Sequence, residues 1–248
     1  MTDLRIAAAA LLLSAAPFAG AAGFAPGEET VFEVRFLSLP TGEGKIAIGQ
    51  PQGDIWPVTF QAKTGGVAGF LDIREHLVSY WDASSKLSRG SDLRAFEVGD
   101  YHHDSQRFDR ANGRVTVTVL RKDRRKERTF PVAEGVQDLT SAFMWLRLQP
   151  LLPGDRYELP VCAGNKQFTL VAEVLGREVV RTGAGTFPTV KVKAHTELEG
   201  HFSAKRDSTL WLSDDSRHLL VRASADFAVG SIVATLKSYR PGTEVASR

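Results

Sequence analysis

The sequence predicts an all-β protein, mainly antiparallel, folded as a barrel or half-barrel with one central helix packed at its mouth or interior. Two observations predict this class. Apolar and polar residues alternate with period two in many short segments, of which RVTVTVL at 114–120 is the clearest. Such alternation is typical of antiparallel strands with one face in water. One segment near the middle, 136–155, instead shows helical spacing followed by a stop.

The first residues have the features of a secretory signal peptide. A short polar start precedes the apolar run 6–16, and Pro17 and the small-residue pattern 19–21 follow it. We therefore expect 1–21 to be a signal peptide and 22–248 to be a single β-barrel-like domain. The apolar run is too short to span a bilayer, and we expect no transmembrane segment in the mature chain. These features predict an exported protein, periplasmic if the source is Gram-negative.

Nine segments are predicted to be strands because their apolar residues recur at every second position. They are 30–36, 44–50, 55–62, 114–120, 166–174, 189–197, 208–213, 218–227 and 230–239. Turn signals rich in Gly, Asn and Asp occur at 41–44, 111–113, 175–177 and 214–216. Regular spacing of short strands and turns favours a barrel or strongly curved sheet over a fold with parallel strands and crossover helices.

The segment VQDLTSAFMWLRLQPLLPGD is predicted to form the helix. Its apolar face consists of Leu139, Ala142, Phe143 and Leu146. Asp138 is expected to cap the N-terminus, with Thr140 as a competing candidate. Pro150 ends the helix, because the residue before a proline avoids helical angles. Met144 and Trp145 widen the apolar surface, so the helix needs cover on more than one side, as the mouth or interior of a barrel would provide.

The helix segment also carries a family resemblance. The pattern Asp138-x-x-Ser141-Ala142-x-x-x-x-Arg147, followed by Pro150-Leu151-x-Pro153-Gly154, resembles the middle of bacterial exported proteins grouped as domain-of-unknown-function family 3108. The start GEETVFEVRFLSLPTGEGKIAI and the end TLWLSDDSRHLLVRASADFAVGSIVATL are similar to that family's opening and closing hairpins. His218-Leu219-Leu220 departs from the family's basic-x-Pro pattern. The resemblance, from about 27 to 239, implies an exported β-rich fold and no catalytic activity.

Three residues are candidates for ligand binding: Tyr80, Trp81 and Arg147. An aromatic wall and one cation would suit a sugar or an anionic amphiphile. The chain has four tryptophans, Trp56, Trp81, Trp145 and Trp211, which could line a cavity or pack in the core, their commoner position in a β-fold.

The histidines do not predict a metal site. In a regular strand the adjacent His102 and His103 point to opposite faces, so they cannot both bind one metal together with Asp104. His195 and His201 could meet across a hairpin beside two glutamates, but exposed hairpin polarity is the favoured interpretation. We predict no metal, no cofactor and no catalytic residue.

Nucleophile and phosphate-binding motifs are also absent from the sequence. The single cysteine, Cys162, cannot form an intramolecular disulfide, and we interpret it as a small buried apolar residue. Hydrophobic residues make up 43% and charged residues 24% of the chain, which argues against global disorder. The net charge of +2 does not indicate a nucleic-acid partner.

The segment from Arg121 to Arg128 is strongly charged, with six basic and two acidic residues. One interpretation is a hairpin tip or strand end that its charges protect against edge pairing. The other is contact with an anionic surface, such as lipid headgroups or an acidic envelope polymer.

Three functions agree with these features. The first is a non-catalytic binding or interaction module for a hydrophobic or cell-envelope-derived ligand or partner, such as a lipid or envelope polymer. The second is a cell-envelope hydrolase with a His/Asp site at the barrel mouth. The third is an envelope assembly factor without a small ligand. The sequence predicts no particular oligomeric state.

Overall fold

The computed structural model describes residues 23–97, 99–122, 124–164, 166–197, 208–227 and 230–243, so the expected signal peptide lies outside the described residues. The first eight strands are β1 Glu29–Phe36, β2 Leu39–Ile48, β3 Ile55–Thr64, β4 Arg74–Asp82, β5 Leu87–Glu97, β6 Asp100–Asp109, β7 Arg114–Arg121 and β8 Arg124–Pro131. The last six are β9 Arg156–Ala163, β10 Lys166–Thr182, β11 Gly185–Glu197, β12 Ser208–Ser213, β13 Leu220–Phe227 and β14 Gly230–Arg240. The helices are the 3-10 helix η1, Gly66–Leu71, and the α-helix α1, Leu139–Leu146.

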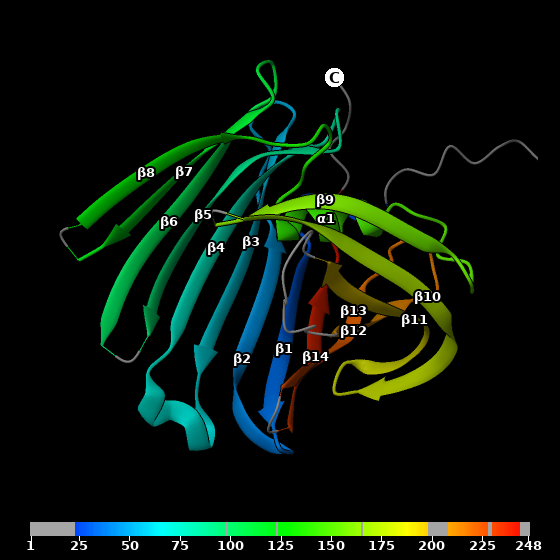
Figure 1. The fold of residues 1–248 in the computed structure, drawn as a ribbon. Coiled ribbons are helices and arrows are strands. Elements are labelled where there is room, and N and C mark those ends of the chain that lie inside the picture. The colour runs from blue at the N-terminus through cyan, green and yellow to red at the C-terminus, as the bar shows by residue number, and fades with distance from the viewer. Residues whose placement is uncertain are drawn as a thin grey trace, which may run out of the picture.

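Within the described residues the strands form one 14-stranded sheet in the order β8-β7-β6-β5-β4-β3-β2-β1-β14-β13-β12-β11-β10-β9. Strands that are neighbours in this order pair antiparallel, and the pairing of β1 with β14 joins the half β1–β8 to the half β9–β14. In Figure 1 the two halves of the sheet curve away on either side of α1. The predicted all-β, mainly antiparallel class is confirmed, and α1 is the one α-helix in the described part of the chain.

The sheet is open, so the closed-barrel alternative is wrong. β8 and β9 are the end strands, and within the described ranges no ladder joins them. The residues before α1 occupy the free edge of β9 instead: Gln137 donates its N–H to the carbonyl of Pro160, and Cys162 donates to the carbonyl of Gln137, each at 2.8 Å. At the other end, β8 is almost entirely exposed and densely charged, which opposes pairing with a further strand.

Two of the four predicted turns are wrong. Residues 41–44 lie inside β2, and the chain reverses earlier, at Leu37 and Ser38, which have φ values of 48° and 66°. Residues 175–177 lie inside the 17-residue β10, where the register with β11 shifts between Val174 and Gly176. In this strand the glycine accompanies a bulge rather than a reversal. The turns at 111–113 and 214–216 are confirmed.

The helix begins and ends as local chemistry requires. Asp138, not Thr140, is the N-cap, and it forms a capping box with Ser141. The helix ends at Leu146, before Pro150. Of its predicted apolar face, Ala142 and Leu146 are buried and Phe143 is partly buried, but Leu139 is 47% exposed, which corrects the prediction for that residue.

The burial of α1 is two-sided because it packs against β9 on one side and β3 and β4 on the other. Ala142 contacts the cluster of Leu159 and Val161 on β9. Met144, which the predicted face did not include, is fully buried in a second cluster. The partners of Met144 there are Phe24, Ile48, Val58 and Trp81.

Candidate ligand-binding site

A buried carboxylate fixes the start of α1 against the inner face of the sheet, the face that α1 covers. Asp138 accepts hydrogen bonds from the hydroxyls of Ser79 on β4 and Ser88 on β5, at 2.7 and 2.5 Å. Its other oxygen accepts from the backbone N–H groups of Thr140 and Ser141. With four donors around it, the 3%-exposed carboxylate is well satisfied. Asp138, which belongs to the motif that resembles the family, thus positions α1 on the sheet.

A buried ion pair fixes the other end of α1. The guanidinium of Arg147 donates to both carboxylate oxygens of Glu28, at 2.7 and 3.2 Å, and to the backbone carbonyl of Arg217. Both side chains are nearly inaccessible, and the guanidinium also lies over the ring of Phe24. The backbone carbonyl of Arg147 lies 2.8 Å from Nδ1 of His218. The motif arginine therefore joins three parts of the chain that are far apart in sequence.

A large cavity opens beside the turn between β1 and β2, and we call it the hairpin-side cavity. It has a volume of about 650 Å³. Apolar side chains from β1, β3, η1, β14 and the segment before β4 make up most of its wall: Val34, Phe36, Phe60, Ala62, Ala68, Ile73 and Ile232. Near its mouth, large apolar side chains of the β1–β2 hairpin and η1 are more than half exposed: Leu37, Leu39, Val67 and Phe70. A cavity of this size and lining suits the apolar part of a ligand.

Two acidic residues, Glu43 on β2 and Glu75 on β4, also line the hairpin-side cavity, and Glu43 forms ion pairs with Lys63 and Lys237. Burial raises the pKa of Glu75, and the charge of Glu97 and a hydrogen bond with it raise that pKa further, while His102 acts in the opposite direction. Glu75 and His102 share Ala95 as their cross-strand neighbour on β5. Glu75, Glu97 and His102 form a polar patch beside a wall that is mostly apolar but also includes Thr41, Glu43, Lys63 and Thr64.

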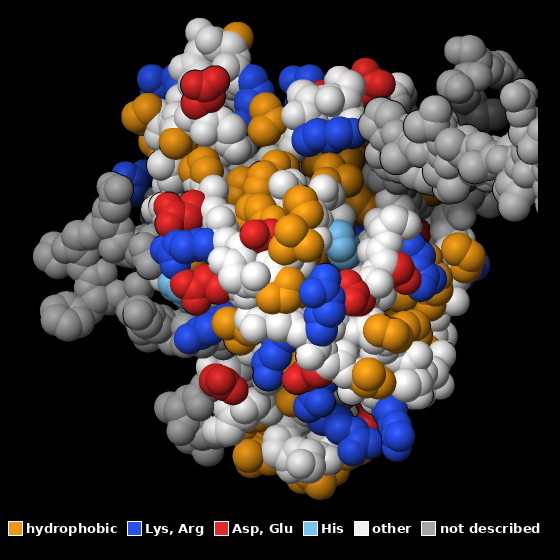
Figure 2. Space-filling model, turned by 90° about the vertical axis from the view of Figure 1, so that its right-hand side faces the viewer, with side chains coloured by type: hydrophobic (Ala, Val, Ile, Leu, Met, Phe, Trp, Pro, Cys, Tyr) orange, Lys and Arg blue, Asp and Glu red, His pale blue; other side chains and the backbone are white. Residues whose placement is uncertain are grey.

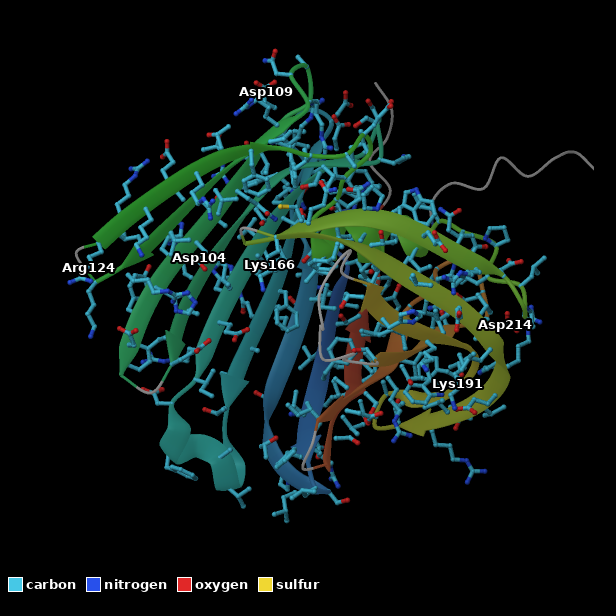
Figure 3. The ribbon with its side chains drawn as sticks, viewed as in Figure 1. Asp104, Asp109, Arg124, Lys166, Lys191 and Asp214 are labelled. Carbon is cyan, nitrogen blue, oxygen red and sulfur yellow. The ribbon has the colours of Figure 1, made fainter. Side chains whose placement is uncertain are left out.

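A smaller cavity of about 160 Å³ lies where α1 begins, and we call it the helix-side cavity. Its apolar lining residues are Leu77, Leu93, Val117, Leu139, Cys162 and Ala163. This placement explains why Leu139 is exposed, since its side chain borders a cavity rather than the packed core. Asp104 on β6, labelled in Figure 3, also lines this cavity and lies 3.4 Å from the guanidinium of Arg121.

The three predicted ligand-binding residues do not converge on one cavity. Trp81 is 1% exposed in the cluster around Met144, and Arg147 is held by Glu28. Tyr80 points to the opposite face of β4, where its hydroxyl donates to Asp92 at 2.9 Å. Ligand contact by Tyr80, Trp81 or Arg147 stays a prediction.

The histidine pair divides between the two faces of β6, as strand geometry requires. His102 is 7% exposed on the inner face, and His103 lies 3.4 Å from Asp92 on the outer face. His195 lies on β11, but His201 falls outside the described residues. In the described part of the chain, no group of three or more His, Cys, Asp or Glu side chains is placed to hold a metal ion.

Cys162 is a buried free thiol, as the sequence predicted. Burial, with a smaller contribution from the charge of Asp138, raises its pKa to about 11. Very little thiolate is therefore present at neutral pH, which counts against a nucleophilic role.

The charged segment at Arg121–Arg128 forms the end of β7, the turn and most of β8, the edge strand of the sheet. This placement agrees with edge protection. Elsewhere the charges are mixed: on the face shown in Figure 2, basic and acidic side chains alternate without forming one continuous area of a single sign.

Sequence reasoning missed the residues that line the two cavities. Glu75, Leu77 and Leu93 lie on β4 and β5, which were not among the predicted strands. Their alternation was hard to recognise because Ser79, Ser88 and Ser91, which are polar, occupy buried positions there. The Ser79 and Ser88 hydroxyls bond to the helix cap, so the polar residues that obscured the pattern are those that hold α1.

Together these features define a class: an all-β protein with one open antiparallel sheet, a short helix fixed to its inner face, and apolar cavities along that face. The chain matches the profile of "Protein of unknown function (DUF3108)" over residues 31–237, and it belongs to this family. No curated protein matches the chain significantly. None of the helices in the described ranges has the length and apolar character needed to cross a membrane.

Solved structures support the fold. The chain is similar to a β-barrel-like protein of domain of unknown function DUF1849 from Brucella abortus, with a TM-score of 0.65, 10% identity, and coverage of 90% of this chain and 100% of that one. At this identity the likeness shows the fold alone.

Two further likenesses carry no argument because their TM-scores are low. A Bacteroides fragilis protein with a YmcC-like fold gives 0.37, at 11% identity over 89% of this chain and 100% of that one. The lipoprotein LppX of Mycobacterium tuberculosis gives 0.27, at 16% identity over 89% of this chain and 90% of that one.

Proposed function

We propose that this protein is a non-catalytic periplasmic binding module that holds a hydrophobic or cell-envelope-derived ligand on the inner face of a half-barrel. The hairpin-side cavity carries the proposal, since its volume of about 650 Å³ and apolar wall suit a ligand with a sizeable apolar part. In this proposal residues 1–21 direct export, and 22–248 form one domain with α1 at the mouth of the half-barrel.

Trp81 and Arg147 act indirectly in this proposal. Trp81 packs in the Met144 cluster, and Arg147 ties the end of α1 to Glu28. By fixing the helix they keep the inner face of the sheet from closing on itself. Direct contact with a ligand is proposed instead for side chains of the cavity wall, such as Phe60 and Ile73.

The hydrolase alternative is less well supported. His102 and Asp104 do share the inner face of β6, but in the described ranges no Ser, Thr or Cys side chain hydrogen-bonds to His102. The assembly-factor alternative draws support from the exposed apolar side chains near the cavity mouth, such as Phe70, which is 84% exposed. A partner protein that covered these side chains would not need the cavity behind them.

Filling the cavity tests the proposal. Ala62→Trp, on the cavity wall, should weaken binding of a fluorescent fatty acid by the delipidated protein by roughly tenfold or more, because a clash in a binding pocket removes a large part of the apolar contact. Gln61→Trp is the matched control, since Gln61 is exposed on the opposite face of β3. Native mass spectrometry of the purified protein should also show a co-purified ligand.

Thermal unfolding checks that each variant folds, and Ala68→Trp on η1 replaces Ala62→Trp if the latter does not. Unchanged binding in a folded cavity variant, or no binding by the wild-type protein, would contradict the proposal. If Phe70→Ser then abolishes capture of a partner protein while the cavity variants do not, the assembly-factor alternative is preferred.

A further inference from the structure

The inner side of the edge strand β8 carries three cations. Phe130 packs against Val115 and Val117 in a core cluster on the inner side. Because side chains two apart on a strand share a face, Arg128, Lys126 and Arg124 project to the same side as Phe130. Figure 3 labels Arg124 at the start of β8, beside the β7–β8 turn.

These inward cations differ from the outward charges of the same strand in their pairing. The outward Arg125 lies 2.7 Å from Glu127, which also accepts a hydrogen bond from Thr118. Among the described carboxylates, none forms an ion pair with Arg124, Lys126 or Arg128. Protection of the sheet edge explains why β8 is charged. It does not explain why the acidic partner within the strand, Glu127, lies on the outer face, away from the inward cations.

Register places the inward cations at the border of the helix-side cavity. Val117, part of the cavity wall, is the cross-strand partner of Arg128, and Val119 is the partner of Lys126. Directly opposed residues have Cβ atoms about 5 Å apart. The long side chains of Arg128 and Lys126 therefore reach the mouth of this cavity.

The nearby acidic groups do not neutralise this border. Asp104 forms an ion pair with Arg121 through one carboxylate oxygen, and the carboxylate of Asp138 is enclosed by four donors. Glu75 lies on β4, four strands away from β8. The border of the cavity at β8 is therefore positive, whereas most of the surface of its wall is apolar.

The two cavities lie along one strand. Leu77 lines the helix-side cavity, and Glu75, two residues away on the same face of β4, lines the hairpin-side cavity. A single ligand can thus place its apolar part along the inner face and a polar end at β8.

We propose that Arg128 and Lys126 form an anion subsite, so that the ligand is an anionic amphiphile: an apolar chain that ends in a carboxylate or phosphate. This inference rests on the proposed function, which it narrows to one ligand class. The apolar chain supplies most of the affinity, and the cations select the charged end.

Palmitate and methyl palmitate test the subsite because they share one chain and differ in charge. At low salt the wild-type protein should bind palmitate roughly fivefold more tightly than methyl palmitate, the preference expected from two exposed cations. The double variant K126Q/R128Q should lose this preference while its affinity for methyl palmitate is unchanged. Raising the salt concentration should reduce the preference in the wild-type protein.

The matched control is K122Q/R125Q, which removes the same net charge from the turn and the outward face and should keep the preference. R128E is a second variant that retains a charge on the edge strand, so it remains protected against edge pairing; it should prefer the methyl ester. Inorganic phosphate should not compete with palmitate at equal concentration, since it lacks the apolar chain.

The outcomes separate the two proposals. If the wild-type protein binds neither probe, the proposed function fails. If it binds both equally, the anion subsite is overturned and the proposed function stands. An equal loss of preference in the control variant would also overturn the subsite, because the selectivity would then come from overall charge.

Discussion

At the scale of single residues, position on a strand decided the role of each side chain. Tyr80 and Trp81 are neighbours in sequence, yet one lies on the outer face bonded to Asp92 and the other in the core. Their shared aromatic character suggested a common wall, but a strand sends adjacent side chains to opposite faces. Glu75, one of the charged residues that line the hairpin-side cavity, has no distinctive sequence context.

Glu75→Gln should raise the free energy of unfolding at neutral pH. The folded-state pKa of Glu75 lies above its unfolded value of about 4.5, so the ionised form costs stability above the folded pKa. This cost falls as the pH falls through the folded pKa and is absent below about pH 4.5, where both states are protonated. Urea denaturation at about pH 8 and about pH 4 measures the difference between variant and wild type at each pH.

The exposed residue Glu134 provides the control, since Glu134→Gln should change stability little at either pH. If Glu75→Gln is no more stable than wild type at the higher pH, the carboxyl group is not penalised by its surroundings.

At the scale of elements, local sequence signals determine where α1 begins and ends, whereas tertiary packing determines which of its residues are buried. The capping aspartate, the apolar content and the stop before Pro150 were all readable from the sequence. The buried face was not, because α1 is covered from two sides and its first turn borders a cavity. Leu139 therefore has the spacing of a core residue and the exposure of a cavity-lining one.

Asp138→Ala should destabilise the protein by at least about 2 kcal/mol, because it removes a helix cap and leaves the buried hydroxyls of Ser79 and Ser88 without their acceptor. Thr140→Ala, at the competing cap position, should cost less than about 0.5 kcal/mol. Chemical denaturation measures both values. Similar losses for the two variants would show that the cap does not hold α1 to the sheet.

For the strands too, the local pattern predicted some elements and failed for others. Alternation identified β7 because the inner residues Val115, Val117 and Val119 alternate with the outer residues Thr116 and Thr118. It failed for β8, where RRKERTFP is charged on both faces, and for β4 and β5, where buried serines interrupt the apolar pattern. Glycine-rich segments led to two wrong turn predictions. Gly42 and Gly44 lie within β2, and the chain reverses at Leu37 and Ser38 instead. Gly176 lies within β10, at the register shift with β11.

At the scale of the whole molecule, the sheet is held around α1 by contacts between distant segments. Glu28 and Arg147 are separated by 119 positions, and Arg147 also bonds to the carbonyl of Arg217, 70 positions further along. Together they tie the start of β1, the end of α1 and the turn before β13. The resemblance to the family included both the early Gly-Glu and the helix arginine, but nothing in the sequence showed that they are partners.

Arg147→Met should lower the free energy of unfolding by about 3–5 kcal/mol, because it leaves the carboxylate of Glu28 buried without a partner. The double variant Glu28→Gln/Arg147→Met should recover part of this loss, since no unpaired charge remains. Arg177→Met breaks the exposed pair with Asp214 and should cost less than about 1 kcal/mol. An additive double variant would mean that the two buried groups do not stabilise each other.

Local chemistry along the chain was sufficient for the all-β class, the antiparallel strands, the helix with its cap and the family resemblance, because these depend on periodicity and on residues a few positions apart. Only the assembled sheet settled that β8 and β9 remain unpaired with each other, that Arg147 meets Glu28, and that two cavities lie along β4. Those features depend on register and curvature accumulated over fourteen strands, which no short segment of sequence encodes.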